Sequence, residues 1–341
     1  SEQLDLGLDA RFFDHRLSFT FDWYHKKTKD WLVQAPVLAS YGTAAPYING
    51  GDVVNKGVEL SLGWRDNIND FNYSALINLS HNKNEVTRIA NTEKIIHSGV
   101  RLGNVASEFA RAEEGYPIGY FYGYQTDGLF QTPEDVQNYK NSEGVVIMPN
   151  AVPGDVRFVD RNDDGIIDDK DKTMIGKSNP DYNLGINLNM SYKGFDLTLV
   201  ASGVFGNDIL RAYRMPDSPS QNYTSEILGR WTGPGTSNSI PRISSGNHIN
   251  RSYISDLYLE DGSYVRMSNV TLGYDFKKLW KSLPFEQVRF YISAQNLFTI
   301  TGYSGMDPEI GTSTGENWIS GVDFGFYPTP RTFMVGASIK F

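Results

Sequence analysis

The stretch YNLGINLNMSYKGFDLTLVAS, residues 182–202, alternates apolar and polar side chains in two runs that meet at Lys193-Gly194. The apolar set is Tyr182, Leu184, Ile186, Leu188, Met190, Phe195, Leu197, Leu199 and Ala201. Successive side chains of a strand point to opposite faces, so this pattern predicts a hairpin with one apolar and one polar face. Alternation does not say which face is buried. A soluble sandwich packs its apolar face inside, whereas a barrel in lipid turns it outward.

The same alternation recurs in seven other segments, which brings the number of predicted strands to nine. These segments lie near residues 4–12, 17–24, 58–65, 71–80, 263–276, 286–299 and 331–341. The predicted strands have about 10 to 12 residues, roughly twice the length of an average globular strand. Tilted strands of about 9 to 11 residues are what a bilayer requires. Strand length therefore favours a membrane barrel.

The connections between these strands alternate strictly between short and long. Short connections lie near 14–16, 66–70, 193–194 and 277–285, and long ones near 28–55, 82–180, 206–260 and 300–330. Outer-membrane barrels combine short periplasmic turns with long extracellular loops. The sequence thus predicts an all-β protein, a transmembrane antiparallel β-barrel. Nine strands alone would leave unpaired edges in lipid, so we expect further strands from outside this sequence.

Composition narrows the class further. The net charge of −9 does not suggest a nucleic-acid partner, and no run of about 18 apolar residues predicts a spanning helix. The absence of cysteine rules out disulfides and thiolate metal sites. The sequence opens directly on an alternating strand, without a secretory leader, which suggests a segment of a longer polypeptide. A soluble or surface β-protein that binds polysaccharide without transport remains the alternative.

Several longer motifs resemble one family in the expected order along nearly the whole chain. They are NKGVELSLGW (55–64), YPIGYFYGYQTDGLFQ (116–131), PGDVRFVDRNDDGIIDDKD (153–171), VRMSNVTLGYDF (265–276), SAQNLFTITGYSGMDPE (293–309) and PTPRTFMVGASIKF (328–341). The chain resembles the C-terminal barrel portion of SusC/RagA-type TonB-dependent transporters of Bacteroidetes. The resemblance implies a 22-stranded barrel in the outer membrane, of which this chain supplies the last nine strands, with its C-terminus on the periplasmic side.

The resemblance also implies partners. The plug and the N-terminal strands would come from the remainder of the same transporter, TonB would supply energy, and a SusD-like surface lipoprotein would cap the barrel. The cargo would be an oligomeric nutrient, an oligosaccharide in preference to an oligopeptide. Phe341 resembles the terminal aromatic signal that the barrel-assembly machinery recognises. It is equally compatible with a place in the lipid-facing wall.

One loop motif carries metal chemistry. In DRNDDGIIDDKD, residues 160–171, the oxygen ligands of a calcium loop fall at the required spacing. The predicted ligands are Asp160, Asn162, Asp164, the carbonyl of Ile166, Asp168 and Asp171. Asp171 stands where the usual loop has Glu, and no flanking helices are evident. We expect a structural Ca²⁺ that stiffens the long extracellular loop 82–180, the alternative being a solvated loop held by Asx turns.

Loop aromatics are the candidate substrate contacts. Tyr41, Tyr47, Trp231 and Trp318 lie in predicted loops and can stack on sugar rings, although aromatic residues also pin loops together. The sequence contains no nucleophile-elbow, phosphate-loop or dinucleotide-binding motif in a strand-turn-helix setting. We therefore expect a transporter component and not an enzyme.

Overall fold

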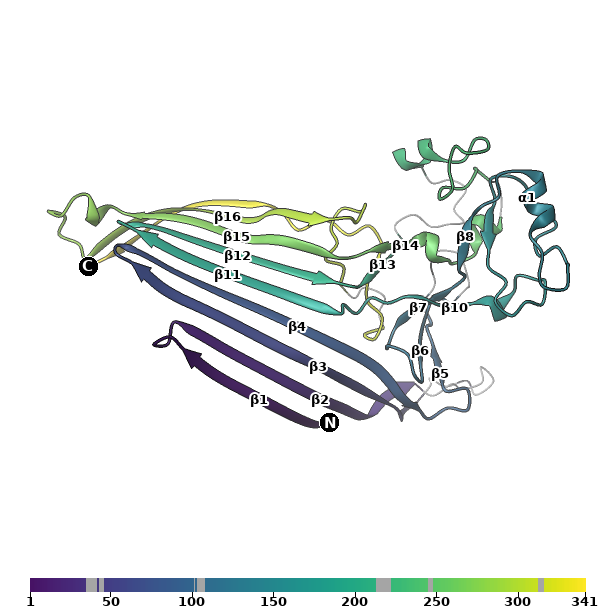
Figure 1. Ribbon diagram of the computed structural model, residues 1–341, viewed down its shortest axis with the longest axis horizontal. Helices are drawn as coiled ribbons and strands as arrows, with labels where there is room; N and C mark the ends of the chain where they lie inside the picture. The colour runs from purple at the N-terminus through teal and green to yellow at the C-terminus, as the bar shows by residue number, and fades with distance from the viewer. Residues whose placement is uncertain are drawn as a thin grey trace.

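The fold is built on one antiparallel sheet of nine strands. The computed structural model describes residues 1–34, 42, 46–100, 102, 108–212, 222–244, 248–311 and 316–341. In spatial order the strands are β1 (Glu2–Phe12), β2 (Leu17–Gln34), β3 (Tyr47–Ile68), β4 (Phe71–Ile89), β11 (Tyr182–Tyr192), β12 (Phe195–Phe205), β15 (Tyr264–Asp275), β16 (Gln287–Thr301) and β18 (Thr332–Lys340). Each strand pairs with its neighbours in chain order (Figure 1). The predicted set of nine strands is confirmed.

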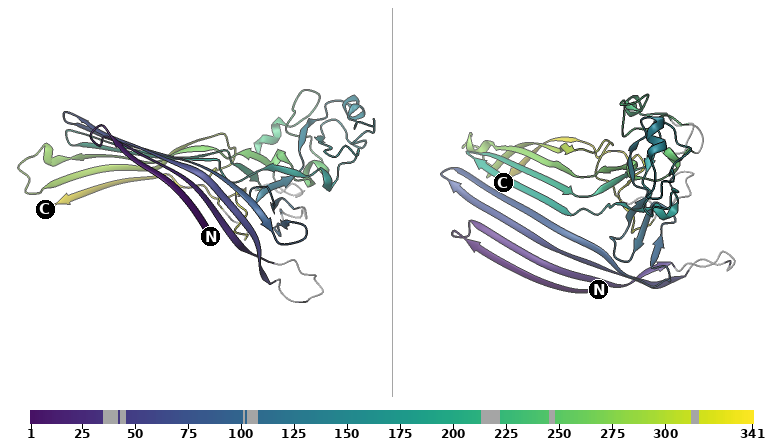
Figure 2. Two further views of the ribbon diagram at one scale, coloured as in Figure 1. Left: turned by 60° about the horizontal axis from the view of Figure 1, so that its bottom comes forward. Right: turned by 45° about the vertical axis from the view of Figure 1, so that its right-hand side comes forward.

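The apolar face of this sheet is continuous from edge to edge. In β12, Leu199 lies opposite Leu188 of β11 and Val270 of β15. The same face continues through these cross-strand pairs: Leu8 with Phe21, Phe21 with Leu60, Leu60 with Leu79, Leu79 with Leu184, Leu272 with Ile292, and Ile292 with Val335. Many of these side chains are exposed, and Leu6, Ile292 and Val335 are 61%, 57% and 83% accessible. The sheet curves as a trough (Figure 2). Among the described residues, its apolar rows remain exposed and do not pack into a closed core.

The opposite face of the same strands is polar. Asp9 of β1 accepts a hydrogen bond from Thr20 of β2 (2.7 Å), and Thr271 of β15 pairs with Ser293 of β16 (2.8 Å). Arg289 of β16 reaches Asp196 of β12 through two nitrogens, at 2.8 and 2.5 Å. These hydrogen bonds join neighbouring or next-nearest strands. Such a face suits contact with water or with polar protein.

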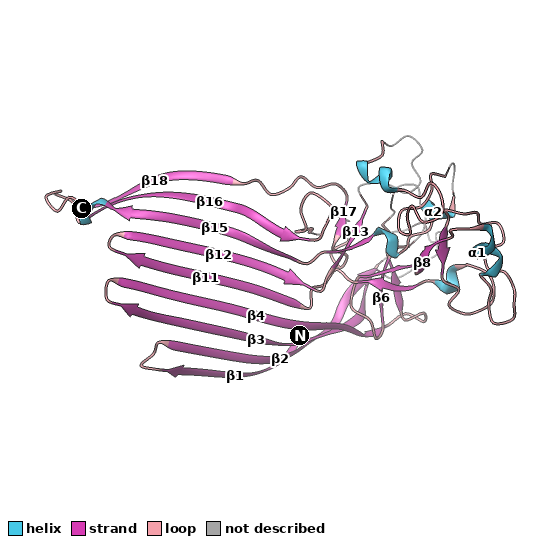
Figure 3. Cartoon of the chain, turned by 45° about the horizontal axis from the view of Figure 1, so that its top comes forward, coloured by secondary structure: helices cyan, strands magenta, loops and turns pink. Residues whose placement is uncertain are grey.

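The two ends of the sheet differ, as the connection lengths predict. Four short connections lie at one end, together with the C-terminus, and all long connections lie at the other (Figure 3). Two predicted connections are wrong in extent. β2 and β3 continue through most of 28–55, and β3 therefore has 22 residues. β4 continues through 82–89, which was expected to belong to the next long connection. The charged run HKKTKD, residues 25–30, hides these extensions because it breaks the apolar alternation.

The extended strands outgrow a bilayer. At about 3.3 Å per residue, β3 spans roughly 70 Å, more than twice the ~30 Å of a hydrocarbon core. Outside hydrocarbon a strand needs no apolar face, and the β2–β3 ladder continues with bulges between Thr28 and Trp31. Asp30 adopts a positive φ of 55° there. The hairpin therefore projects beyond the membrane-compatible part of the sheet.

A glycine lets one tyrosine cross the polar face of three strands. Tyr24 of β2 lies opposite Gly57 of β3, and its hydroxyl donates to Asn82 of β4 (2.9 Å). A Cβ atom on Gly57 would lie 2.7 Å from the Tyr24 hydroxyl and 2.1 Å from the carbonyl oxygen of His81. The glycine thus makes room for the bridge.

The long connections form a folded cap over one end of the sheet. The cap contains the sheet β10 (Thr173–Gly176), β7 (Tyr120–Gly123), β6 (Ala110–Glu113) and β5 (Ile95–His97); the sheet β14 (Leu259–Asp261), β13 (Asp208–Arg211) and β17 (Val322–Asp323); and the pair β8 (Thr126–Leu129) and β9 (Val156–Phe158). Two short helices, α1 (Pro133–Asn138) and α2 (Ile249–Ser252), complete it. Within the described ranges, no helix has the length and apolar character to cross a bilayer.

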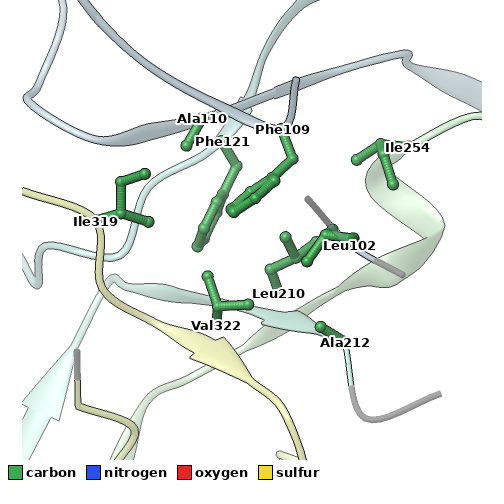
Figure 4. Close-up of a cluster of buried hydrophobic side chains, with 9 residues drawn as sticks. All are labelled: Leu102, Phe109, Ala110, Phe121, Leu210, Ala212, Ile254, Ile319 and Val322. Atoms are coloured by element: carbon green, nitrogen blue, oxygen red, sulfur yellow. The ribbon is translucent and has the colours of Figure 1, made fainter. Parts of the chain in front are cut away.

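A hydrophobic core lies in this cap. A cluster of nine buried residues joins three long connections, those between β4 and β11, β12 and β15, and β16 and β18 (Figure 4): Leu102, Phe109, Ala110, Phe121, Leu210, Ala212, Ile254, Ile319 and Val322. Phe109, Phe121 and Ile319 are fully buried. Because the cluster draws on residues more than 200 positions apart in sequence, the connections fold as one unit.

We expect Gly57→Ala to lower the thermal unfolding midpoint of the full-length protein in detergent. The added methyl must displace Tyr24 or the backbone of β4, and such overpacking costs about 1 to 3 kcal/mol. Gly185→Ala is the matched control, since a Cβ there would lie 3.8 Å from Asn78. Equal midpoints for the two variants would contradict the bridge.

Candidate functional site

The cap contains a cavity of about 500 Å³ that is open to solvent on one side. Its lining comes from the end of β13, the 3-10 helices η3 (Ser225–Gly229) and η4 (Asp256–Tyr258), α2, and residues 239–244. The rings of Tyr223 and Tyr258 and the side chains of Ile227 and Leu257 form its apolar part. Aromatic and aliphatic surface with a few polar groups is typical of a ligand pocket.

The charged groups at this cavity are matched to one another. The guanidinium of Arg211 lies 2.9 Å from Glu226 and 3.1 Å from Glu260. Glu260 also accepts hydrogen bonds from the backbone and the hydroxyl of Ser304, both at 2.7 Å. Asp256 accepts from the hydroxyl (2.6 Å) and the backbone N–H of Thr126. The carboxylates of Glu226, Glu260 and Asp256 therefore already have partners within the protein before a ligand binds.

A buried carboxylate fixes one wall of the cavity. Asp155 is 1% accessible and accepts from Arg242 Nε (2.7 Å) and Asn250 Nδ2 (2.9 Å). Both donors line the cavity. The same asparagine accepts from the backbone N–H of Val156 (3.0 Å). These bonds tie the start of α2 to the segment before β9.

A second buried ion pair holds the last long connection against the polar face. Arg266 of β15 is 4% accessible and donates to Asp307, to Glu309 (2.7 Å) and to Thr299 (3.1 Å). Asp307 also accepts from the backbone N–H groups of Glu309 (3.0 Å) and Thr329 (2.9 Å). Burial raises the pKa of Asp307, but the two backbone donors and Arg266 outweigh burial and hold it below its usual value of 3.8.

The predicted calcium loop is ordered by its own side chains. Asp160 Oδ2 accepts from the Gly165 N–H (2.8 Å), and Asp164 Oδ1 accepts from the Ile166 N–H (3.1 Å). Asp171 is fully buried and accepts from the N–H groups of Arg161 and Asp168, both at 2.8 Å. Gly165 has a φ of 82°, as the sharp turn requires. The Asx turns of the alternative interpretation are therefore present.

Two features bear on a cation in this loop. Asp160 Oδ1 is buried without a hydrogen-bond partner, and Lys170 Nζ lies 3.5 Å from Asp164 and 3.6 Å from Asp168. The amide of Asn162, followed by Ile166 N–H and Lys170, holds the pKa of Asp164 below its usual range. Among the described residues, no three acidic or histidine side chains converge as a metal-binding group. The calcium site stays a prediction.

The three described residues among the predicted substrate aromatics lie in different surroundings. Trp231 packs on the cluster around Phe130 and donates from Nε1 to Gln131 (3.1 Å), and Trp318 lies against two buried clusters. Tyr47 is 68% accessible at the start of β3. Tyr41 lies outside the described residues. The substrate role of all four stays a prediction.

Phe341 lies directly after β18, on the parity of its apolar face. Its ring is 86% accessible and meets Phe285 edge-on at 5.2 Å. This placement agrees with a side chain at the rim of the sheet, and the assembly role of Phe341 stays a prediction.

The sequence analysis missed the cavity entirely. Its residues come from five separate segments, and none of these segments carries a recognisable motif. The one usable signal was indirect, namely that arginines and tyrosines recur through 211–258 in an otherwise acidic chain.

Comparison with known proteins gives consistent matches. The sequence matches the family described as TonB dependent receptor-like, beta-barrel, over residues 1–205. It is 33% identical to TonB-dependent receptor P3 of Formosa agariphila, covering 100% of this chain and 34% of that protein. It is 29% identical to TonB-dependent receptor SusC of Bacteroides thetaiotaomicron, covering 98% of this chain and 31% of that protein.

Solved structures agree with the sequence matches. The structure of the RagAB peptide transporter superposes with a TM-score of 0.75 at 25% identity, covering 99% of this chain and 35% of that chain. The same importer in a closed-closed state gives a TM-score of 0.74. The chain thus spans about a third of the length of its relatives.

We expect Arg266→Met to release the segments 303–311 and 322–330 from the polar face. Removing one partner of a buried ion pair costs about 3 to 5 kcal/mol, because the remaining carboxylate is left uncompensated. Hydrogen exchange at the amides of Glu309 and Thr329 should accelerate strongly. Arg16→Gln, which removes an exposed pair with Asp66, should leave this exchange unchanged.

The anchor should also weaken in acid. The pKa of Asp307 is lowered in the folded state, so its contribution is present above pH 3.8 and is lost as the pH falls through the lowered value. Exchange at Thr329 that is insensitive to pH across this window, after correction for the intrinsic rate, would contradict the anchoring role.

Proposed function

The chain belongs to the TonB-dependent receptor-like β-barrel family, and we propose that it forms the C-terminal wall and extracellular cap of an outer-membrane importer. One observation carries the proposal: the nine-stranded sheet leaves one continuous apolar face open and gathers every long connection at one end. In the proposed orientation the cap is extracellular and the short turns and the C-terminus are periplasmic. We assign a transport role, and no catalytic one, to this arrangement of sheet and cap.

The proposed importer needs parts that this chain does not contain. Further strands would close the barrel by pairing with the edges β1 and β18, since an unpaired edge in lipid costs several kcal/mol per unsatisfied group. A plug would fill the bore, TonB would supply energy, and a SusD-like lipoprotein would cover the cap. Support comes from relatives that are named TonB-dependent receptors and SusC, and from the RagAB complex.

We propose that the cap cavity contacts the cargo, and that the cargo is an oligosaccharide. Two tyrosine rings beside polar groups suit the flat apolar face and the hydroxyls of a sugar. The carboxylates at the cavity are already paired, so an uncharged ligand avoids an unmatched charge. The RagAB neighbours are described as transporters of peptides, which makes an oligopeptide the competing cargo.

We also propose a structural Ca²⁺ in residues 160–171. Asp160, Asn162, Asp164, the carbonyl of Ile166, Asp168 and Asp171 would hold it, and Lys170 would give way to it. Support comes from the buried Asp160 Oδ1, which accepts no hydrogen bond, and from hard oxygen donors at the spacing that calcium prefers. The Ca²⁺ would replace the ammonium group of Lys170 as the positive charge beside Asp164 and Asp168.

The uptake proposal is tested in cells that express the full-length transporter with its lipoprotein partner. Tyr258→Ala should reduce uptake of the cognate oligosaccharide at least about tenfold, because truncating a central aromatic contact commonly costs ~2 kcal/mol. Tyr116→Ala, a cap tyrosine outside the cavity, is the control. Uptake that persists without TonB, or that is selective for peptides, would contradict the corresponding part of the proposal.

The calcium proposal is tested by thermal unfolding with and without added Ca²⁺. The native protein should gain stability, and Asp160→Asn and Asp164→Asn should abolish this calcium-dependent shift. Asp127→Asn removes an exposed acidic partner of Arg157 outside the loop and should retain the shift. A shift of equal size in all variants would refute the assignment.

A further inference from the structure

The connection between β15 and β16 differs from the other short turns. Residues 276–286, FKKLWKSLPFE, carry three lysines among five apolar residues, and we call this segment the interfacial turn. It projects past the other hairpins at the end of the sheet that holds the C-terminus (Figure 1). A connection that only reverses the chain needs neither this length nor this composition.

The interfacial turn is ordered by its own hydrogen bonds. Its first residues form the 3-10 helix η5 (Phe276–Lys278), which is capped by Asp275 through the Lys277 N–H (3.0 Å). Lys277 Nζ donates to the carbonyl oxygens of Lys281 (2.9 Å) and Leu283 (2.5 Å). Lys277 therefore stabilises the turn itself, and its hydrogen bonds fix the shape of the turn.

The aromatic side of the interfacial turn continues the apolar face of the sheet. Trp280 stacks on Phe276, with ring centroids 5.4 Å apart. Phe276 meets Tyr274 and Phe290 edge-on at 5.1 and 5.4 Å, and Phe195 packs on Tyr274 at 4.5 Å. Phe195, Tyr274 and Phe290 are cross-strand neighbours on the apolar face. Trp280 nevertheless remains 54% accessible and Leu279 59%.

The other two lysines are exposed beside this aromatic group. Neither Lys278 nor Lys281 forms a salt bridge with any residue that the structure describes. The stem of Lys278 lies beside Gly194 of the neighbouring hairpin. The acidic groups close by are engaged: Asp275 caps η5 and accepts from the Val288 N–H, and Glu286 pairs with Lys340 at 2.9 Å.

We propose that the interfacial turn docks on anionic phospholipid headgroups of the leaflet that adjoins the short-turn end of the sheet. Trp280 and Leu279 enter the boundary between headgroups and acyl chains, and Lys278 and Lys281 contact lipid phosphates. Continuity with the apolar face and the unpaired positive charge both favour a lipid surface over a protein. The proposal rests on the outer-membrane placement given above.

Lipid binding by the full-length transporter tests this proposal. The protein is titrated in detergent with phosphatidylglycerol or phosphatidylcholine, and bound lipids are counted by native mass spectrometry. Each lysine at an anionic surface contributes roughly a factor of five, so K278Q/K281Q should weaken phosphatidylglycerol binding by about 25-fold and leave phosphatidylcholine binding unchanged. The control K26Q/K140Q removes two exposed lysines at the cap end.

The outcomes separate the docking proposal from the transport proposal. Unchanged phosphatidylglycerol binding in K278Q/K281Q, or an equal loss in K26Q/K140Q, overturns the docking site even if uptake is normal. A photo-crosslinker at position 280 that captures a protein instead of lipid in intact cells overturns it as well. Loss of phosphatidylglycerol binding confined to K278Q/K281Q supports it even if uptake proves independent of TonB. Retention of the heat-sensitive gel mobility of the folded barrel confirms that each variant is folded.

Discussion

Backbone hydrogen bonding in a medium without water is the constraint on which this structure depends. A strand in hydrocarbon can satisfy its N–H and C=O groups only through its neighbours. The nine strands meet this requirement in unbroken chain order, from β1 to β18, with ladders that shift register at few places. Once the ladder is fixed, one face of every strand must be apolar, and the pleat makes the other face available for polar groups.

The cap follows from the same division of environments. Outside the membrane the chain is in water, and loops of this length would be costly to order unless they buried apolar surface of their own. The long connections bury such surface in a hydrophobic core around Phe109, Phe121 and Leu210, whereas the apolar residues of the sheet remain exposed. Buried ion pairs at Asp155 and Arg266 then fix the connections to one another and to the polar face. The cavity lies in the part of the molecule that is built like a soluble domain.

Sequence reasoning predicted the sheet well and the cap poorly, for a physical reason. The period of two in 182–202 is a local consequence of a one-sided environment, so it is visible in a single strand. The extensions of β2 and β3 lack that environment, and their Lys and Asp residues gave no signal. The cap core joins Leu102 to Ile319 and Val322, contacts that no local pattern encodes. In 160–171 the acidic side chains form the Asx turns that the sequence offered as the alternative to a calcium site, because these turns need only local hydrogen bonds. The calcium ion stays a prediction.

The orientation of the sheet, with its apolar face toward hydrocarbon and its polar face toward water or polar protein, can be measured directly. This part of the protein contains no cysteine. Single cysteine substitutions at positions 195 to 202, made in a full-length protein from which any other cysteine has been removed, can each carry a spin label in lipid vesicles. Labels at 195, 197, 199 and 201 should collide with oxygen dissolved in the bilayer, and labels at 196, 198 and 202 should not. A profile without this alternation, or with its parity reversed, would contradict this orientation of the sheet.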